Sequence, residues 1–391
     1  MTLGLAVLAL SYVLSQFYRA FLAVLTPVLQ SEIGAGPEAL SVVSGMWFLS
    51  FALMQVPVGW ALDTIGPRRT AAALLLVGGG GGSALFALAT TPFHLSAGMF
   101  LIGIGCAPVL MASYYIFARQ FPAAQFATLA SVMVGVGMSG NLFASYPLAL
   151  AVEAIGWRGS LWVLAAVSAL TALGIWVWVS DPPKPEGEEK GSLRALFRIR
   201  VLWLIFPLMF FSYAPVAAIR GLWVGTYLND VFGADTRMIG QATLIVGAFM
   251  ILGAISYGPL DRLLGQRKWL VSIGTALTIA ALVTLWTIPA SNIWISVALM
   301  SAICFFGMTY AVLITHGRDF LPPHLIGRGM TMLNLCSIGG VGLLQFISGK
   351  LHTATLSGNP AAPYQAIFGL FAVTLSAGLL IYLFSRDNRA G

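Results

Sequence analysis

Long apolar stretches recur along almost the whole of this 391-residue chain, and they constrain its fold more than any other feature. Each runs for about 20 residues, the length that an α-helix needs to cross roughly 30 Å of hydrocarbon. Only 8% of the residues are charged, against roughly 25% in a soluble domain. We therefore expect an all-α membrane protein with twelve transmembrane helices, at residues 4–29, 38–62, 70–90, 94–117, 126–152, 158–180, 201–228, 238–261, 268–288, 292–316, 325–350 and 364–385.

One polar run divides these helices into two groups of six. Between Asp181 and Arg200 the chain has three prolines, three glutamates and five basic residues, a composition typical of a linker. The sequence therefore predicts an N-terminal six-helix bundle at 1–181, a cytoplasmic linker at 182–200 and a C-terminal six-helix bundle at 201–391.

The loops of the two groups also repeat. Gly59-Trp-Ala-Leu-Asp-Thr-Ile-Gly-Pro-Arg-Arg69 follows the second expected helix, and Gly258-Pro-Leu-Asp-Arg-Leu-Leu-Gly-Gln-Arg-Lys268 follows the eighth. The two segments end 199 residues apart. Such a repeat predicts a pseudo-two-fold axis along the membrane normal, with a substrate site near the bilayer midplane between the halves.

The distribution of basic residues predicts the orientation. Of the twenty Lys and Arg residues, fifteen fall on the side that holds the linker and both termini. Short cytoplasmic loops are enriched in Lys and Arg, so we expect this side to be cytoplasmic in a multi-pass protein of a bacterial inner membrane. The same bias accounts for the net charge of +7 without a nucleic-acid partner. The three cysteines all lie inside expected spans and indicate neither a metal site nor a disulfide framework.

Two arginines interrupt the apolar spans at matching positions. Arg19 follows Ser11-Tyr12, seven residues after the tyrosine, and Arg220 follows Ser212-Tyr213 at the same spacing. An arginine at membrane depth costs at least ~2.5 kcal/mol and usually faces a cavity or a partner. The matched pair predicts one shared central site, although each arginine could instead bond helix-end carbonyls or extend to the membrane interface.

The residue types around these arginines predict an anion as the ligand. Only Asp230 and Asp319 come near a span, and both lie towards its end, so no carboxylate is available at the midplane. Two guanidinium groups attract an anion, and their paired N–H donors suit a carboxylate or a phosphate. Other residues expected to bind the substrate are Tyr12, Gln16, Tyr213, Trp223, Tyr227, Tyr114, Tyr310 and Asn141. For the last three, packing in the core or at the lipid interface explains the residue type equally well.

The Gly59–Arg69 loop resembles the G-x-x-x-D-x-x-G-x-R-R loop of the major facilitator superfamily, and the resemblance covers nearly the whole chain. It implies a fold of two six-helix bundles and a conformational latch formed by Gly59, Asp63, Gly66, Arg68 and Arg69. The second copy of the loop has one residue fewer between its glycine and its aspartate. There, Asp261 and Arg267 correspond to the latch residues. A static cytoplasmic cap is the alternative role for both loops.

The arginines on the first and seventh helices are similar to those of organophosphate:phosphate antiporters in this superfamily. This similarity is limited to Arg19 and Arg220. Residues 135–141 faintly resemble a glycine motif of nitrate porters, but the arginines of those porters are expected on helices 2 and 8, where this chain has none. We expect these glycines, and the run Gly78–Gly82, to let helices approach closely.

These observations predict a secondary transporter that moves a small organic anion, an organophosphate or a carboxylate, by alternating access. A coupling ion or a counter-substrate is left open. We expect no cofactor, no bound metal and no catalytic residue, because no nucleophile-base pair or phosphate-binding loop is present. One chain holds both halves, which favours a monomer. Two alternatives are efflux of amphipathic drugs or lipids, and uptake of copper through soft ligands such as Cys106, Cys304 and Met308.

Overall fold

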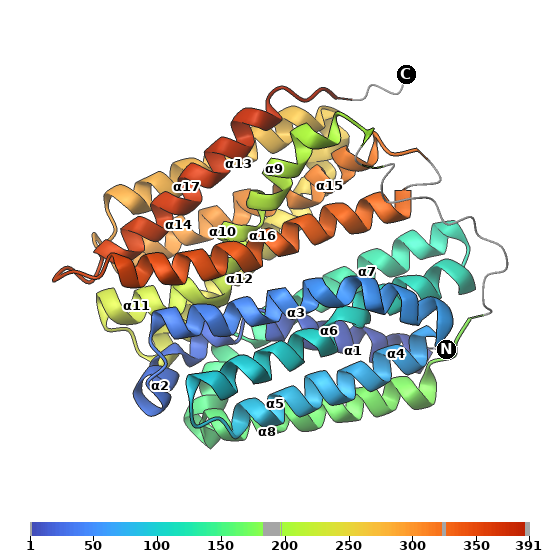
Figure 1. Cartoon of the computed structure of the whole chain (residues 1–391), viewed down its shortest axis with the longest axis horizontal. Coiled ribbons are helices and arrows are strands. Elements are labelled where there is room, and N and C mark those ends of the chain that lie inside the picture. The colour runs from blue at the N-terminus through green and yellow to red at the C-terminus, as the bar shows by residue number, and fades with distance from the viewer. Residues whose placement is uncertain (1, 183–195, 197, 323–325, 388–391) are drawn as a thin grey trace. The chain divides into compact units, whose positions relative to one another are not determined.

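The computed structural model describes residues 2–182, 196, 198–322 and 326–387, and most of these residues are helical. The chain divides into two compact units. Unit 1 comprises Met1–Glu188 and Asp235–Leu244, and unit 2 comprises Glu189–Ala234 and Ile245–Gly391. Of the expected linker at 182–200, residues 183–195 and 197 lie outside the described part. Figure 1 shows the helices of both units with their labels.

Unit 1 consists of long helices and short irregular segments. Its elements are α1 (Thr2–Tyr18), α2 (Leu22–Ile33), α3 (Pro37–Thr64), α4 (Pro67–Leu74), the π-helix η1 (Leu75–Gly81), α5 (Gly82–Ala87), α6 (Pro92–Gln120), α7 (Ala123–Phe143) and α8 (Tyr146–Trp178). The first residues of α12 (Thr236–Leu264) also belong to it.

Unit 2 contains the rest of α12 and the helices that precede and follow α12 in the sequence, from α9 to α17. Its other elements are α9 (Leu202–Ser212), α10 (Ala214–Ala218), the π-helix η3 (Ile219–Trp223), α11 (Val224–Phe232), α13 (Arg267–Thr287), α14 (Ile293–Phe306), the 3-10 turn η4 (Gly307–Thr309), α15 (Tyr310–Arg318), α16 (Ile326–Ala354) and α17 (Ala362–Tyr382).

A glycine ends α2 in unit 1 and α11 in unit 2, the helices that follow the two central arginines. Gly34 follows α2 with φ 69°, and Gly233 follows α11 with φ 65°. In each case the glycine N–H donates to a carbonyl of the last helical turn. Only glycine adopts this left-handed conformation without a steric cost, so both ends are set by local sequence.

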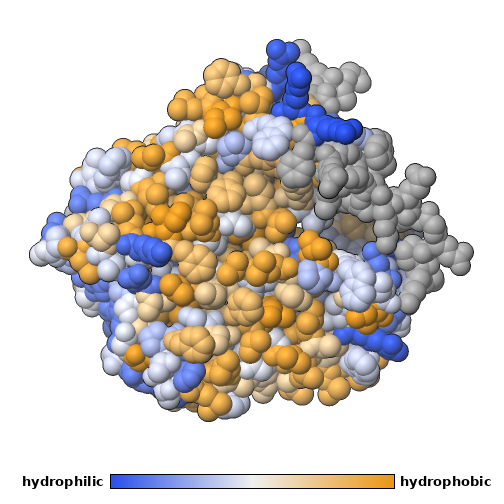
Figure 2. Space-filling model, in the orientation of Figure 1, coloured by the Kyte–Doolittle hydropathy of each residue, from blue (hydrophilic) through white to orange (hydrophobic). Residues whose placement is uncertain are grey.

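Ten helices in the described part of the chain are long and apolar enough to cross a membrane. An eleventh candidate is the pair α1 and α2, which meet at a bend of 50°. Figure 2 shows hydrophobic side chains over the middle of the helices on the visible face. Many large apolar side chains point outward, including Trp60 and Leu263, which are 63% and 81% exposed. This exposure suits helices that face lipid.

Three expected spans are interrupted in the structure. The span expected at 4–29 is broken between Tyr18 and Leu22, and the span expected at 201–228 is divided at Tyr213. The span expected at 126–152 is interrupted between Phe143 and Tyr146, and its second part forms the start of α8. Prolines at the second positions of α8 and α10 explain two of these breaks, because proline has no N–H and starts a helix better than it continues one. A further kink within α8 lies at Gly156, where φ is 72°.

Several of the predicted packing glycines bring helices into close contact, as the sequence predicts, whereas a Cβ on Gly135 would have no atom within 4 Å. A Cβ atom on Gly78 of η1 would lie 2.4 Å from the Gly105 nitrogen of α6. On α7, a Cβ on Gly140 would lie 2.0 Å from the Val13 carbonyl oxygen, and one on Gly137 would overlap the Tyr12 ring. A larger residue at any of these positions would force the helices apart.

Candidate functional site

Arg19 lies at the bend of the first span, one residue beyond the end of α1. Its side chain is half-buried, and its guanidinium carbon lies 4.8 Å from the centre of the Trp47 ring and 5.2 Å from that of Phe51. These rings stack on each other, one turn apart on α3, with centres 4.9 Å apart. Among the described residues, no carboxylate forms an ion pair with Arg19. Aromatic faces therefore provide the negative potential around this charge.

The neighbouring predicted residues of unit 1 form a separate polar group. The Gln16 amide donates a hydrogen bond of 2.7 Å to the Tyr12 hydroxyl, one helical turn away on α1. Tyr12 packs on Gly137 of α7, and Asn141 on the same helix is 3% exposed. Tyr114 is half-buried on α6, with its ring against Phe126. The helical spacing thus brings Tyr12 and Gln16 together but does not extend to Arg19, because α1 has ended.

Arg220 lies inside the π-helix η3 and is 2% exposed. Its guanidinium group lies beside Gly247 of α12. Both arginines therefore occupy an irregular part of their span, a broken helix in unit 1 and a π-helix in unit 2. Single π-turns inside α-helices occur frequently at functional sites.

Tyr213 and Tyr310 form a second polar group, in unit 2. Their ring centres are 5.0 Å apart, and the Tyr310 hydroxyl donates a hydrogen bond of 2.5 Å to Asn334 Oδ1 on α16. All three side chains are half-buried. Asn334 is absent from the set of substrate residues predicted from the sequence. The only feature of the sequence that could have indicated Asn334 is that it is a polar residue in an apolar span.

Trp223 and Tyr227 lie in the interior of unit 2 and are 0% exposed. The Trp223 indole donates to Ser348 Oγ at 3.1 Å, and its ring stacks on His352. The Tyr227 hydroxyl bonds to Ser296 Oγ at 2.8 Å and to the Pro289 carbonyl. These contacts fix the helix that carries Arg220 against α14 and α16.

The predicted latch loop of unit 1 is joined to the end of α8. The Arg68 backbone N–H donates to Asp181 Oδ1 at 2.8 Å, and Arg68 Nε lies 3.7 Å from Asp181 Oδ2. Gly66 has φ 110°, and a Cβ there would lie 2.9 Å from the same carboxylate. Asp181 thus accepts an otherwise unbonded N–H at the start of α4. Asp63 and Arg69 are exposed, and Gly59 is half-exposed.

The second loop has a related arrangement in unit 2. Arg267 Nε donates to both carboxylate oxygens of Asp261, at 3.0 and 3.1 Å, and its Nη1 bonds to Asp319. The Lys268 N–H donates to Asp387 Oδ1 at 2.9 Å, which parallels the bond between Arg68 and Asp181. In each unit, an aspartate just after the last helix therefore binds the start of the helix that follows the loop.

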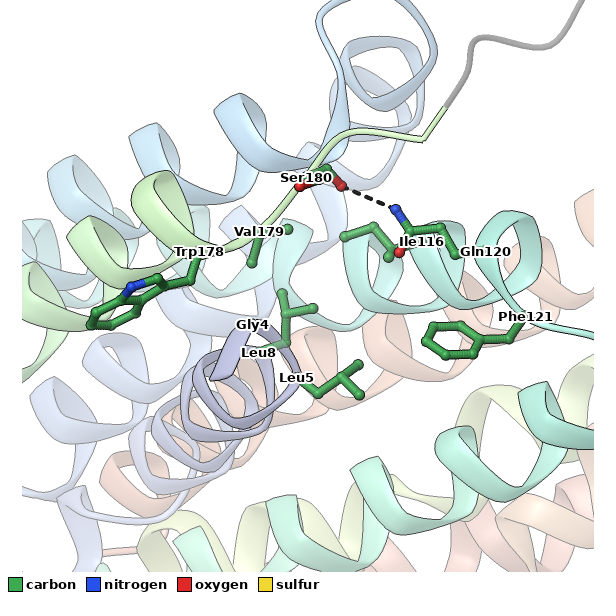
Figure 3. Close-up of a pocket in the computed structure, with 9 residues that line it drawn as sticks. All are labelled: Gly4, Leu5, Leu8, Ile116, Gln120, Phe121, Trp178, Val179 and Ser180. Carbon is green, nitrogen blue, oxygen red and sulfur yellow. Dashed lines mark hydrogen bonds between the residues drawn. The ribbon is translucent and has the colours of Figure 1, made fainter. Parts of the chain in front are cut away.

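A cavity of about 450 Å³ lies at one end of unit 1, between α1, α6 and the end of α8 (Figure 3). The Gln120 amide donates to the Ser180 carbonyl at 3.4 Å across its rim. The residues that line it are Gly4, Leu5, Leu8, Ile116, Gln120, Phe121, Trp178, Val179 and Ser180. None of them belongs to the substrate or latch residues predicted from the sequence.

Comparison with known proteins identifies the family. The model of the family described as "Major Facilitator Superfamily" matches residues 8–345. An uncharacterized transporter, YybO, of Bacillus subtilis is 22% identical over 63% of this chain and 61% of its own length. A protein of Cupriavidus necator with the name "Probable sulfoacetate transporter SauU" is 23% identical over 67% of this chain and 65% of its own length. The chain thus spans less than two thirds of the first two curated relatives that it matches.

Solved structures show the same fold. A bacterial homologue of the human lysosomal transporter Spinster, in an inward-facing and occupied conformation, superposes with a TM-score of 0.76 at 18% identity. The match covers 97% of this chain and 96% of that one. Proteins of this superfamily are multi-pass transporters of small molecules in lipid bilayers, not enzymes. The match over residues 8–345 shows that this chain belongs to the Major Facilitator Superfamily.

Proposed function

We propose that this transporter moves a small organic anion, a carboxylate or an organophosphate, by alternating access, with Arg19 and Arg220 as its anion clamp. One observation carries the proposal: each unit holds an arginine, preceded by Ser-Tyr at the same spacing, at an irregular point of an apolar span. Guanidinium groups offer paired N–H donors, which match two oxygens of a carboxylate or phosphate.

The surroundings of Arg19 support an anionic ligand. Its charge lies over the rings of Trp47 and Phe51, and a cation–π contact of this kind is worth only about 0.5–2 kcal/mol. An anion in hydrogen-bond range would stabilise the guanidinium group more, because charge-assisted hydrogen bonds are the stronger interaction. The relative from Cupriavidus necator, which is named a probable transporter of sulfoacetate, also supports an anion.

The proposal includes the expected membrane architecture. Two six-helix bundles, at 1–181 and 201–391, would rock about the substrate, with both termini and the linker on the cytoplasmic side of an inner membrane. Asp63, Arg68 and Arg69, with Asp261 and Arg267, would form the latch. The bonds of Arg68 to Asp181 and of Arg267 to Asp319 suit this role, because they join each loop to another segment of its own unit.

The position of the two cysteines makes copper the weaker alternative. Cys106 and Cys304 are buried, and the proposed substrate site also holds the guanidinium groups of Arg19 and Arg220. A guanidinium cation repels Cu(I), so neither thiol offers a favourable site while the arginine is charged.

Uptake into proteoliposomes tests the proposal. Labelled sulfoacetate, other carboxylates, glycerol 3-phosphate, a cationic drug and Cu(I) would be compared with and without a pH gradient. We expect uptake of an anion, and a loss of at least about tenfold for Arg19→Gln, Arg220→Gln and both Arg→Lys variants, because lysine lacks the planar fork. Arg119→Gln is the matched control, since Arg119 stacks on Tyr115, away from both central arginines in sequence. Normal anion uptake by all four variants would refute the clamp, and uptake of only the drug or Cu(I) would refute the substrate class.

A further inference from the structure

A second cavity, of about 410 Å³, lies in unit 2 at the end of α11. Asp230 in the last turn of α11 and His352 in the last turn of α16 both line it. Its other walls are formed by the segment after α16 and the start of α17. A carboxylate and an imidazole thus share one cavity, and neither group belongs to the proposed anion clamp or to the latch.

Aromatic side chains hold these two groups in place. The Tyr364 hydroxyl of α17 donates a hydrogen bond of 2.5 Å to Asp230 Oδ2. The Tyr364 ring also meets the His352 ring edge to face, with ring centres 5.1 Å apart. In addition, the His352 ring stacks on Trp223 of η3, with ring centres 5.8 Å apart and planes inclined by 20°. His352 is 4% exposed, so the imidazole has a defined position in the wall of the cavity.

The matching end of unit 1 has an ion pair with a permanent charge. There, Glu32 binds Arg158 at 2.6 Å and accepts a hydrogen bond of 2.8 Å from the Trp157 indole. Glu32 and Asp230 each lie in the last turn of the helix that follows a central arginine. In the described part of the chain, no lysine or arginine forms an ion pair with Asp230. Arginine is always charged, whereas histidine gains and loses its charge between about pH 5 and 8.

Few titratable groups surround His352. In the described part of unit 2 they lie on α11, α16 and α17, and they are Tyr227, Asp230, Lys350 and Tyr364. Lys350 is exposed, and tyrosine is neutral near pH 7. The helices α9 and α10, which also pack on α16, contain no titratable residue. On α15, His316 contacts Tyr382, at the opposite end of α17 from Tyr364. Asp230 is therefore the charged group that shares the cavity with His352.

We propose that this cavity is a proton-binding site, in which His352 takes up a proton beside Asp230. A proton from water adds to one nitrogen of the imidazole ring, so the step needs no other reactant. The imidazolium ion and the carboxylate then balance each other in charge, as Arg158 and Glu32 do in unit 1. The imidazolium ion also gains a cation–π attraction to the Trp223 ring on which it stacks.

Trp223 connects this proton site to Arg220. The two residues are three positions apart in η3, and the Trp223 indole also donates to Ser348, one turn before His352 on α16. A stronger contact between His352 and Trp223 holds η3 more firmly against α16. The added positive charge in unit 2 also attracts an anion. This link rests on the proposed function, in which Arg220 binds the anion. Proton binding then raises the affinity for the anion, and the anion raises the affinity for the proton by the same factor.

A histidine titration tests the proton site without any anion. The chain has four histidines, so selective 13C-histidine labelling of the purified full-length protein gives few ring signals in an NMR spectrum. The signal that is missing from His352→Gln belongs to His352. We expect it to titrate between about pH 5 and 8 in the wild type. In Asp230→Asn the midpoint should fall by roughly one pH unit, because the neighbouring negative charge is lost.

The matched control is His94→Gln, which replaces a half-buried histidine at the start of α6 in unit 1. It should leave the titration of His352 unchanged. Asp230→Asn keeps the imidazole in place, so the titration can still be measured if His352→Gln does not fold.

Anion binding tests the link to the proposed function. The Kd values of sulfoacetate, acetate and glycerol 3-phosphate would be measured between about pH 5.5 and 8.5, on either side of the ordinary titration of histidine. Comparison with His352→Gln removes the titration of the probe itself. Beyond that of the variant, we expect the wild-type Kd to rise at least about fivefold with increasing pH, the lower end of typical coupling between two sites. His94→Gln should behave like the wild type.

The possible failures are distinct. If the His352 signal does not titrate in this range, the proton site is wrong and the proposed function is unaffected. If it titrates while the wild type and His352→Gln share one pH dependence of Kd, the link between the proton and the anion is wrong. If none of the three probes binds, or if Arg19→Gln and Arg220→Gln both bind them normally, the proposed function fails, and the histidine titration still decides the proton site.

Discussion

The guanidinium group of Arg19 lies 4.8 Å from the centre of the Trp47 ring, at the point where the first span bends by 50°. The contact joins the segment between α1 and α2 to α3, and Phe51 extends it by one helical turn. An aromatic face carries a partial negative potential, so it stabilises a cation without a formal charge that would compete with an anionic ligand for the arginine.

We predict that Trp47→Leu weakens anion binding by up to about 30-fold, because the Arg19 guanidinium group would lose the cation–π contact of about 0.5–2 kcal/mol that holds it in position and would have to be ordered on binding. Trp47→Phe should keep most of the affinity, because it retains an aromatic face. Trp60→Leu, at a site that is 63% exposed, serves as the control. Isothermal titration with the anion that is taken up best into proteoliposomes measures Kd for all three variants. Equal Kd values for the leucine and phenylalanine variants at 47 would mean that the ring contributes only volume.

Gly78→Ala should destabilise the protein by about 1–3 kcal/mol, because its methyl group would overlap the backbone of α6. Gly135→Ala should be neutral or stabilising by up to about 1 kcal/mol, since a Cβ there has no atom within 4 Å and alanine favours a helix. The melting temperatures of the two variants and the wild type, measured in the same detergent, test both expectations. A normal melting temperature for Gly78→Ala would show that α6 moves aside easily.

Asp181→Ala should destabilise the N-terminal end of α4 by about 1 kcal/mol, the usual loss when a helix-start acceptor is removed. Asp181→Asn should lose less, because its amide oxygen still accepts the Arg68 N–H. Hydrogen exchange at Arg68, measured by mass spectrometry on peptides from this loop, reports the change. If the Arg68 N–H exchanges as slowly in Asp181→Ala as in the wild type, the Asp181 carboxylate does not stabilise the start of α4.

In unit 2, the ion pair between Arg267 and Asp319 should contribute a measurable coupling energy to stability. A double-mutant cycle of Arg267→Gln with Asp319→Asn should give roughly 0.5–1 kcal/mol, because the groups are about 30% exposed and partly screened by water. The same cycle for Arg68 and Asp181, whose side-chain ions are 3.7 Å apart, should give less. Thermal unfolding of each set of four proteins provides both values. A larger coupling energy for Arg68 and Asp181 than for Arg267 and Asp319 would contradict this prediction.

Much of the fold could be predicted because it depends on local composition. The apolar spans, the repeated loops and the close contacts of Gly78, Gly137 and Gly140 are all visible as patterns in the sequence. The breaks within the spans were harder to predict. No proline or glycine lies between Tyr18 and Leu22, where the first span bends. The side chain at the bend contacts a ring 28 residues further along the chain, and nothing in the local sequence indicates that contact.

The candidate site could be predicted in part for a related reason. Arg19 and Arg220 stand out because a charge in an apolar span is costly. The contact between Gly247 and the Arg220 guanidinium group gives no such signal, because a glycine in a membrane helix most often serves packing. The sequence places Asp181 at the boundary of a linker, and its bond to Arg68 spans 113 residues. Only the folded chain brings these pairs together.

The bond between Asp181 and Arg68 has a mechanical consequence. Asp181 is the last residue before the segment that leads to the second half of the chain, and its carboxylate binds the first turn of α4. Any displacement of Asp181 would therefore act on the start of α4 and on the Gly59–Arg69 loop at the same time. One carboxylate thus couples the residues that follow α8 to the loop between α3 and α4.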